Sequence, residues 1–106
     1  MNRSMIIRPG AHTDLMDHYV FIALDSPAAA DRFVKAVQTT FEMLADMPKI
    51  GALWNSQHIR LEGIRFYPVG GFPNHLVFYR ATVDAVEILH ILHGARDIAT
   101  VLTSEE

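Results

Sequence analysis

Cysteine is absent from this chain of 106 residues, which excludes disulfide bonds, cysteine zinc sites and thiol nucleophiles. Basic residues are also few, because nine Lys and Arg stand against twelve Asp and Glu and give a formal net charge of −3. Proteins that bind a nucleic-acid backbone usually concentrate Lys and Arg, so direct binding to DNA or RNA is disfavoured.

Long apolar runs are missing as well. No run approaches the roughly 18 residues that span a bilayer. Arg8 and Pro9 interrupt the apolar N-terminal stretch before it reaches the length of a secretion signal. We therefore expect a cytoplasmic protein that has no contact with the membrane.

What is present is enough apolar material for one core, since 50% of the residues are hydrophobic. A chain of this length removes roughly two thirds of its unfolded surface from water on folding, so it needs neither a disulfide nor a structural metal. We expect a single domain over residues 1–106, with residues 1–4 and 103–106 frayed.

The first half of the chain has helical periodicity. After a short strand over residues 5–8, closed by a Pro-Gly pair, the apolar spacing predicts a helix over residues 11–24. Ser26 is a suitable N-cap and Pro27 suits the first position of a second helix, which reaches about residue 47. Two helices joined by so short a turn are expected to pack as an antiparallel hairpin.

The second half is rich in β-branched and aromatic residues. It predicts strands over residues 64–69, 75–81 and 86–92, after a loop over residues 52–60 and before a short helix over residues 95–102. The expected architecture is α+β in the order β-α-α-β-β-β(-α). The helix hairpin would cover one face of a mainly antiparallel sheet.

Signatures of catalysis are missing from the sequence. Gly70-Gly71 lies between two strands and is not followed by the residues of a phosphate-binding loop. His90 and His93 are three positions apart on one strand and therefore point to opposite faces, which argues against a metal site. Neither a metal nor a cofactor is expected.

Four basic side chains lie at or near the predicted strands: Arg65, Arg80, His93 and Arg96. A hairpin that turns symmetrically about residues 72 and 73 would set Arg65 opposite Arg80, and such a like-charge pair favours a bound anion between them. Alternatively, a two-residue turn in the next hairpin would set Arg80 opposite Glu87, while Glu62 would neutralise Arg65. The sequence leaves both arrangements open.

Six short phrases follow one another along the chain and cover nearly all of it from Ile6 to Leu102. They are Ala11-x-x-Asp14-Leu15, Ser26-Pro27-x-Ala29-Ala30-x-Arg32-Phe33, Phe41-x-x-Leu44-Ala45-x-Met47-Pro48-x-Ile50-Gly51, Leu61-Glu62-Gly63-Ile64-Arg65, Val77-Phe78-Tyr79-Arg80 and His93-Gly94-Ala95-Arg96-Asp97-Ile98. In order and spacing they resemble the ParE branch of the RelE/ParE superfamily of type II toxin–antitoxin toxins.

The resemblance implies a small toxin, encoded on a plasmid or a chromosome, that a ParD-like antitoxin binds and neutralises. On a plasmid such a system serves plasmid stabilisation. ParE-like toxins act on DNA gyrase and block replication without catalysis, whereas RelE-like relatives are ribosome-dependent mRNA endonucleases. The acidic charge favours the ParE type. So does the absence of any Lys after Lys49 and any Tyr after Tyr79, because the lysine-rich strand and C-terminal tyrosine of the RelE type then have no counterpart. A module that binds only an antitoxin is a third possibility.

The resemblance also suggests which residues bind partners. Candidates for target binding, or for catalysis in the ribonuclease alternative, are Arg65, Arg80, His93 and Arg96. Candidates for antitoxin binding, on the helix hairpin and at a sheet edge, are Leu15, Tyr19, Phe33, Val37, Phe41 and Trp54. Because the toxin is itself acidic, its binding to an acidic antitoxin is expected to depend on buried apolar area and only weakly on salt.

Overall fold

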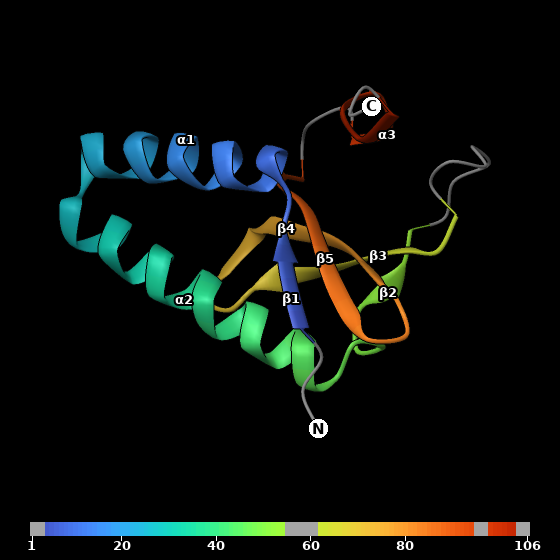
Figure 1. Cartoon of the computed structure of the whole chain (residues 1–106). Coiled ribbons are helices and arrows are strands. Elements are labelled where there is room, and N and C mark those ends of the chain that lie inside the picture. Colours follow the sequence, from blue (N-terminus) through green and yellow to red (C-terminus); the bar gives the residue numbers. More distant parts are fainter. Residues whose placement is uncertain (1–3, 55–61, 95–97, 104–106) are drawn as a thin grey trace.

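A helix hairpin and a five-stranded sheet form the two main layers of the molecule (Figure 1). The computed structural model describes residues 4–54, 62–94 and 98–103. Its elements are β1 (Ser4–Ile7), α1 (Pro9–Asp25), α2 (Pro27–Asp46), β2 (Ala52–Leu53), β3 (Ile64–Val69), β4 (Phe72–Ala81), β5 (Ala85–His93) and α3 (Ile98–Thr103). In the part of the chain that is described, no helix is long and apolar enough to cross a membrane.

The strands follow the order β1-β5-β4-β3-β2 across the sheet. β1 pairs with β5 in parallel, and the remaining neighbours are antiparallel. The predicted α+β class and the mainly antiparallel sheet are therefore confirmed. The parallel pair arises because the helix hairpin, inserted after β1, carries the chain back over one face before the antiparallel strands begin.

Several boundaries differ from those expected from the sequence, among them the start of β4, which is Phe72 rather than residue 75. α1 begins at Pro9 rather than after the Pro-Gly pair, because a proline at the first helical position has a suitable φ and lacks an N–H that would be unbonded there anyway. A two-residue strand, β2, lies within the segment expected to be a loop. Ser4 belongs to β1 and Thr103 to α3, although both were assigned to frayed ends.

The start of α2 follows the prediction closely. Ser26 is the N-cap, its Oγ accepts a hydrogen bond of 3.2 Å from the amide of Ala29, and Pro27 occupies the first turn. The helix is strongly amphipathic and directs one stripe into the core: Ala30, Phe33, Val37, Thr40, Phe41, Leu44 and Ala45.

Replacing Ser26 with alanine is expected to lower the free energy of unfolding by about 1 kcal/mol, because the amide of Ala29 loses its acceptor. Urea denaturation followed by circular dichroism measures this change. A Thr13→Ala control at an exposed position of α1 should stay within about 0.5 kcal/mol of the parent. Equal effects of the two substitutions would show that the cap does not stabilise the helix.

The two faces of the sheet carry separate apolar cores. The larger core lies under the helix hairpin and is built around Phe33, Val37, Leu44, Val77, Tyr79, Val86, Ile88 and Ile91. The smaller core lies on the other face and contains Ile64, Phe78, Leu92, Ile98 and Leu102, so that α3 covers this face. Both faces of the central strands are therefore buried, which accounts for their nearly continuous apolar sequence.

Candidate functional site

Arg65 and Arg80 do not face each other. The register of β3 and β4 pairs Arg65 with Tyr79 and Ile64 with Arg80, one residue away from the symmetrical hairpin considered for the sequence. The difference arises because the chain turns at Gly70-Gly71, where Gly71 has φ +79°, and the register shifts between Pro68 and Val69. Neighbouring residues of a strand point to opposite faces. The two arginines therefore lie on opposite sides of the sheet, and no anion can sit between them.

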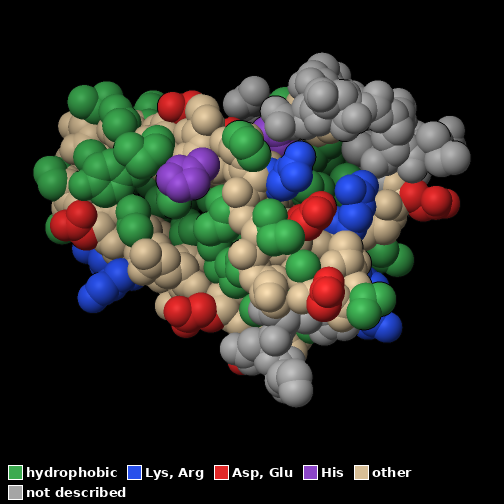
Figure 2. Space-filling model, viewed as in Figure 1, with side chains coloured by type: hydrophobic (Ala, Val, Ile, Leu, Met, Phe, Trp, Pro, Cys, Tyr) green, Lys and Arg blue, Asp and Glu red, His purple; other side chains and the backbone are tan. Residues whose placement is uncertain are grey.

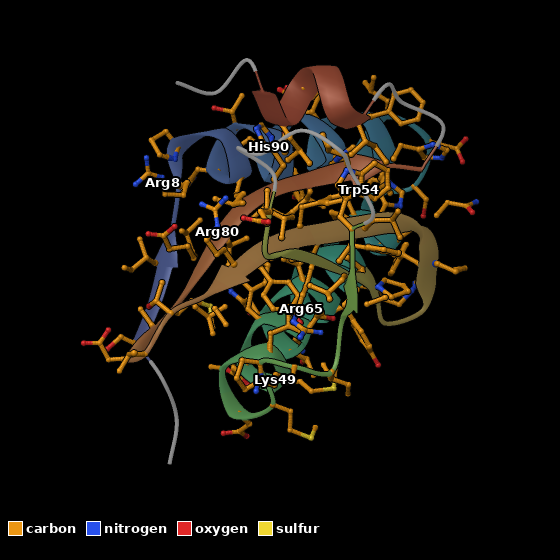
Figure 3. The ribbon with its side chains drawn as sticks, turned by 90° about the vertical axis from the view of Figure 1, so that its right-hand side faces the viewer. Arg8, Lys49, Trp54, Arg65, Arg80 and His90 are labelled. Carbon is orange, nitrogen blue, oxygen red and sulfur yellow. The ribbon has the colours of Figure 1, made fainter. Side chains whose placement is uncertain are left out.

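Arg65 instead fastens the loop that joins α2 to β2. Its Nη1 donates hydrogen bonds to the carbonyl oxygens of Gly51 at 2.7 Å and Lys49 at 3.4 Å. In Figure 3 the labels of Arg65 and Lys49 lie together, away from Arg80. The guanidinium thus holds backbone oxygens, and Glu62 is not needed to account for its position.

Tyr79 of β4 holds the same loop between α2 and β2 through its buried hydroxyl. Its hydroxyl donates to the carbonyl of Pro48 at 2.7 Å and accepts from the amide of Gly51 at 2.9 Å. Burial raises the pKa of Tyr79 above its ordinary value of 10.0, although the Gly51 amide and the Arg65 charge act in the opposite direction. The phenol therefore stays protonated near neutral pH and keeps donating to Pro48. Together with Arg65 it gives the loop a defined shape.

Arg80 follows the second arrangement considered for the sequence. It pairs in register with Glu87 across β4 and β5, and a tight turn after Ala81 brings the two strands together. The predicted pairing of Arg80 with Glu87 is therefore confirmed. Arg80 shares its face of the sheet with Ile64 and the smaller core.

The remaining two basic candidates lie elsewhere. His93 is the last residue of β5 and pairs with His75. Its ring lies 5.4 Å from the ring of His75, on the side of the sheet that α1 covers. Arg96 lies outside the described residues. The structure therefore does not bring Arg65, Arg80 and His93 into one cluster.

Three of the antitoxin candidates lie in the core. Phe33 and Val37 are fully buried and Phe41 is nearly so, because the stripe of α2 that they form packs on the sheet. Their assignment to a contact surface is therefore wrong for this folded state. Trp54 is half-buried, and its ring packs against the rings of Phe66 and Phe78 at 6.0 and 5.7 Å, respectively.

The apolar surface that remains lies on α1. Leu15 and Tyr19 are half-buried in the hairpin, and the Tyr19 hydroxyl reaches Asp31 of α2 at 3.5 Å. The opposite side of the same helix exposes four large apolar side chains: Met16, Val20, Phe21 and Leu24. Figure 2 shows hydrophobic side chains gathered over the end of the molecule where α1 turns into α2. We call these four residues the α1 patch.

A polar network that the sequence interpretation missed joins α1 to β5. The Asp14 carboxylate accepts hydrogen bonds from His90 Nδ1 at 2.6 Å and from the Ile91 amide at 3.0 Å. His18, one turn further along α1, bonds through Nε2 to the Ile91 carbonyl at 2.8 Å. A signal was available in the four-residue spacing of Asp14 and His18, which places both on one side of a helix. Among the described residues, no group of histidines and carboxylates is placed to hold a metal ion.

One family model matches most of the chain. A family model described as the ParE toxin of the type II toxin–antitoxin system parDE matches residues 5–98. Among solved structures, the chain is similar to one of a chromosomal ParDE toxin–antitoxin system from P. aeruginosa. That match has a TM-score of 0.68 and 21% identity over 86% of this chain and 95% of the other.

A second similar structure belongs to a RelBE toxin–antitoxin complex from Mycobacterium tuberculosis. Its TM-score is 0.61 and its identity is 19%, over 88% of this chain and 99% of the other. At such identities the two structures establish the shared fold. No curated protein sequence matches the chain significantly.

Proposed function

Since the chain belongs to the ParE toxin family of type II toxin–antitoxin systems, we propose that it arrests growth by binding DNA gyrase and blocking replication, without catalysing a reaction. The separation of the basic residues carries this proposal. Cleavage of RNA requires cationic and acid–base groups that converge on one phosphate. Arg65 and Arg80 lie on opposite faces of the sheet, and Arg65 is bonded to backbone carbonyls.

The charge and the apolar sheet face support the same conclusion. A nuclease that docks on ribosomal RNA needs a basic surface, whereas this chain has a formal net charge of −3. The sheet face that bears Arg80 is covered by the smaller core and α3. Arg80 and the exposed His93 remain candidates for direct contact with gyrase. Arg65 would act by positioning the loop that carries Lys49, and Arg96 stays a candidate on sequence grounds alone.

A ParD-like antitoxin is the second partner that we propose. The α1 patch offers a helix face with apolar residues at a spacing of four, which suits an amphipathic segment that folds on binding. The outer edge of β1, where Ile6 and Ile7 are partly exposed, offers a second apolar surface. These residues replace the buried members of the candidate set, while Leu15 and Tyr19 lie beside the α1 patch on the same helix. Trp54 follows β2 at the opposite edge of the sheet and stays a candidate on sequence grounds alone.

Induced expression without antitoxin tests the target. We expect filamentation and DNA-damage signalling while bulk mRNA stays intact, and we expect the purified toxin to inhibit supercoiling by purified gyrase. Coexpression with the antitoxin is the matched control and should restore growth.

Two other outcomes would contradict the proposal. Rapid codon-linked cleavage of mRNA after induction would establish a ribosome-dependent endonuclease of the RelE type. Normal growth, together with full gyrase activity in the presence of toxin, would leave a module that only binds the antitoxin.

A further inference from the structure

The open edge of β5 is closed by side chains of α1. β1 pairs with β5 only from Ala85 to Ile88, and the amide of Arg8 makes the last backbone bond, to the Ile88 carbonyl. Within the described residues, no strand lies beside β5 beyond this point. Asp14 and His18 take the place of a strand, because one accepts from the Ile91 N–H and the other bonds to the Ile91 C=O. A buried strand edge must have its backbone groups bonded in this way.

His18 also begins a row of three histidine rings. Its ring lies 4.8 Å from that of His75 in an edge-to-face arrangement, and the His75 ring lies 5.4 Å from that of His93. The same three residues line a surface pocket of about 390 Å³ together with Phe21 and Ile22. Imidazole rings from α1, β4 and β5 thus lie side by side at this end of the sheet.

His75, at the centre of the row, resists protonation. Burial, and then the neighbouring His18 and His93, lower its pKa from 6.5 to about 4. The other rings around it are those of Phe33 on α2 and Phe72 on its own strand, which cannot balance a positive charge. The titratable groups that face it from α1 and β5 are themselves histidines, while the Asp14 carboxylate is bonded to His90 and Ile91.

We propose that Asp14, His18, His75 and His93 form an acid-sensitive clasp, which holds α1 on the open edge of β5 near neutral pH and releases it on acidification while the central strands stay paired. In the folded state His75 binds a proton less readily than in the released state. Stability of the closed clasp is therefore lost as the pH falls from about 6.5 towards 4. The His18 and His93 rings that flank His75 oppose a positive charge there, so protonation of His75 drives the opening.

The clasp goes beyond the proposed function and is a property of the toxin alone. α1 also carries the α1 patch, so release of this helix would weaken the binding of an antitoxin. This consequence rests on the proposed function. Figure 3 shows His90, which donates to the Asp14 carboxylate, between α1 and α3.

Amide hydrogen exchange of the isolated toxin, measured by NMR at about pH 7.5 and about pH 5 and corrected for intrinsic rates, tests the clasp. We expect the protection of the Ile91 amide to fall at least about tenfold more on acidification than that of Val77, which is buried in the central strand β4. A parallel loss at Ile91 and Val77 would overturn the proposal, because acid would then unfold the whole domain.

Two variants and one control assign the effect to the histidine row. His75→Phe keeps a ring but cannot titrate, and it should abolish the additional loss at Ile91. His93→Gln, at the exposed end of the row, should reduce it and is informative even where His75→Phe does not fold. His12→Gln, at an exposed position of α1, should leave it unchanged. A full additional loss in His93→Gln and in a folded His75→Phe would overturn the proposal.

Discussion

Replacing Gly51 with alanine is expected to lower the free energy of unfolding by about 2–3 kcal/mol, the upper range for overpacking a dense site. A Cβ at this position would lie 2.5 Å from the Tyr79 hydroxyl oxygen and 2.7 Å from the carbonyl oxygen of Phe66. Neither neighbour can withdraw easily. Phe66 O belongs to a paired strand, and the Tyr79 ring is fully buried.

The same substitution also breaks hydrogen bonds. To make room, the Tyr79 hydroxyl has to leave the Gly51 amide and the Pro48 carbonyl, and both are buried. Buried backbone groups without partners destabilise the fold further. Arg65 donates to the Gly51 carbonyl, so the loop that carries Lys49 should lose its shape together with its stability.

Urea denaturation of the variant, followed by tryptophan fluorescence and circular dichroism, measures the loss. Gly70→Ala is a matched control, because a Cβ there meets no atom within 4 Å and Gly70 does not have a positive φ. This control should change stability by less than about 0.5 kcal/mol. Comparable losses in the two variants would mean that the contact between Gly51 and Tyr79 does not constrain the loop.

Local rules account for the parts of the fold that could be predicted from the sequence. Ser26 and Pro27 mark the start of α2 because a cap and a first-turn proline act within a few residues. The strand over residues 64–69 is bounded by turn residues and was placed correctly. The family was also within reach of the sequence, since its phrases extend along nearly the whole chain.

Register and exposure could not be predicted, because they depend on tertiary contacts. A one-residue change in the hairpin around Gly70-Gly71 moves Arg65 and Arg80 to opposite faces. The apolar stripe of α2 is the clearest in the sequence, and for that reason it forms the core rather than a contact surface. Asp14 and His90 are 76 positions apart, so nothing local indicates that they meet.

The buried side of α1 could not be predicted from the sequence, for a related reason. Leu15 and Ile22 pack against the core on one side, while Val20 and Leu24 are exposed on another. Apolar residues on two sides weaken the amphipathic pattern, because periodicity alone does not tell which side meets the sheet. The structure separates the two sides, because one packs on the sheet and the other is the exposed α1 patch.

The double variant Val20→Gln and Leu24→Gln is therefore expected to weaken binding of the cognate antitoxin at least about 30-fold, which corresponds to the loss of about 2 kcal/mol that marks an interface hot spot. Leu24 is 83% exposed and Val20 is 54% exposed in the toxin alone, so the substitutions disturb the packing of the fold only slightly. Both positions belong to α1, and glutamine favours a helix. The melting temperature should accordingly stay close to that of the parent.

Isothermal titration calorimetry with the purified antitoxin measures this effect, and Val83→Gln is the matched control. Val83 is 93% exposed in the turn between β4 and β5. The control therefore makes the same exchange of an apolar for a polar side chain, but away from the two helices. Its affinity should equal that of the parent. The parent affinity should also change little between low and high salt, because burial of apolar area is not screened by ions. An unchanged affinity in the double variant, or a steep loss of parent affinity with salt, would place the antitoxin on a charged surface instead of the α1 patch.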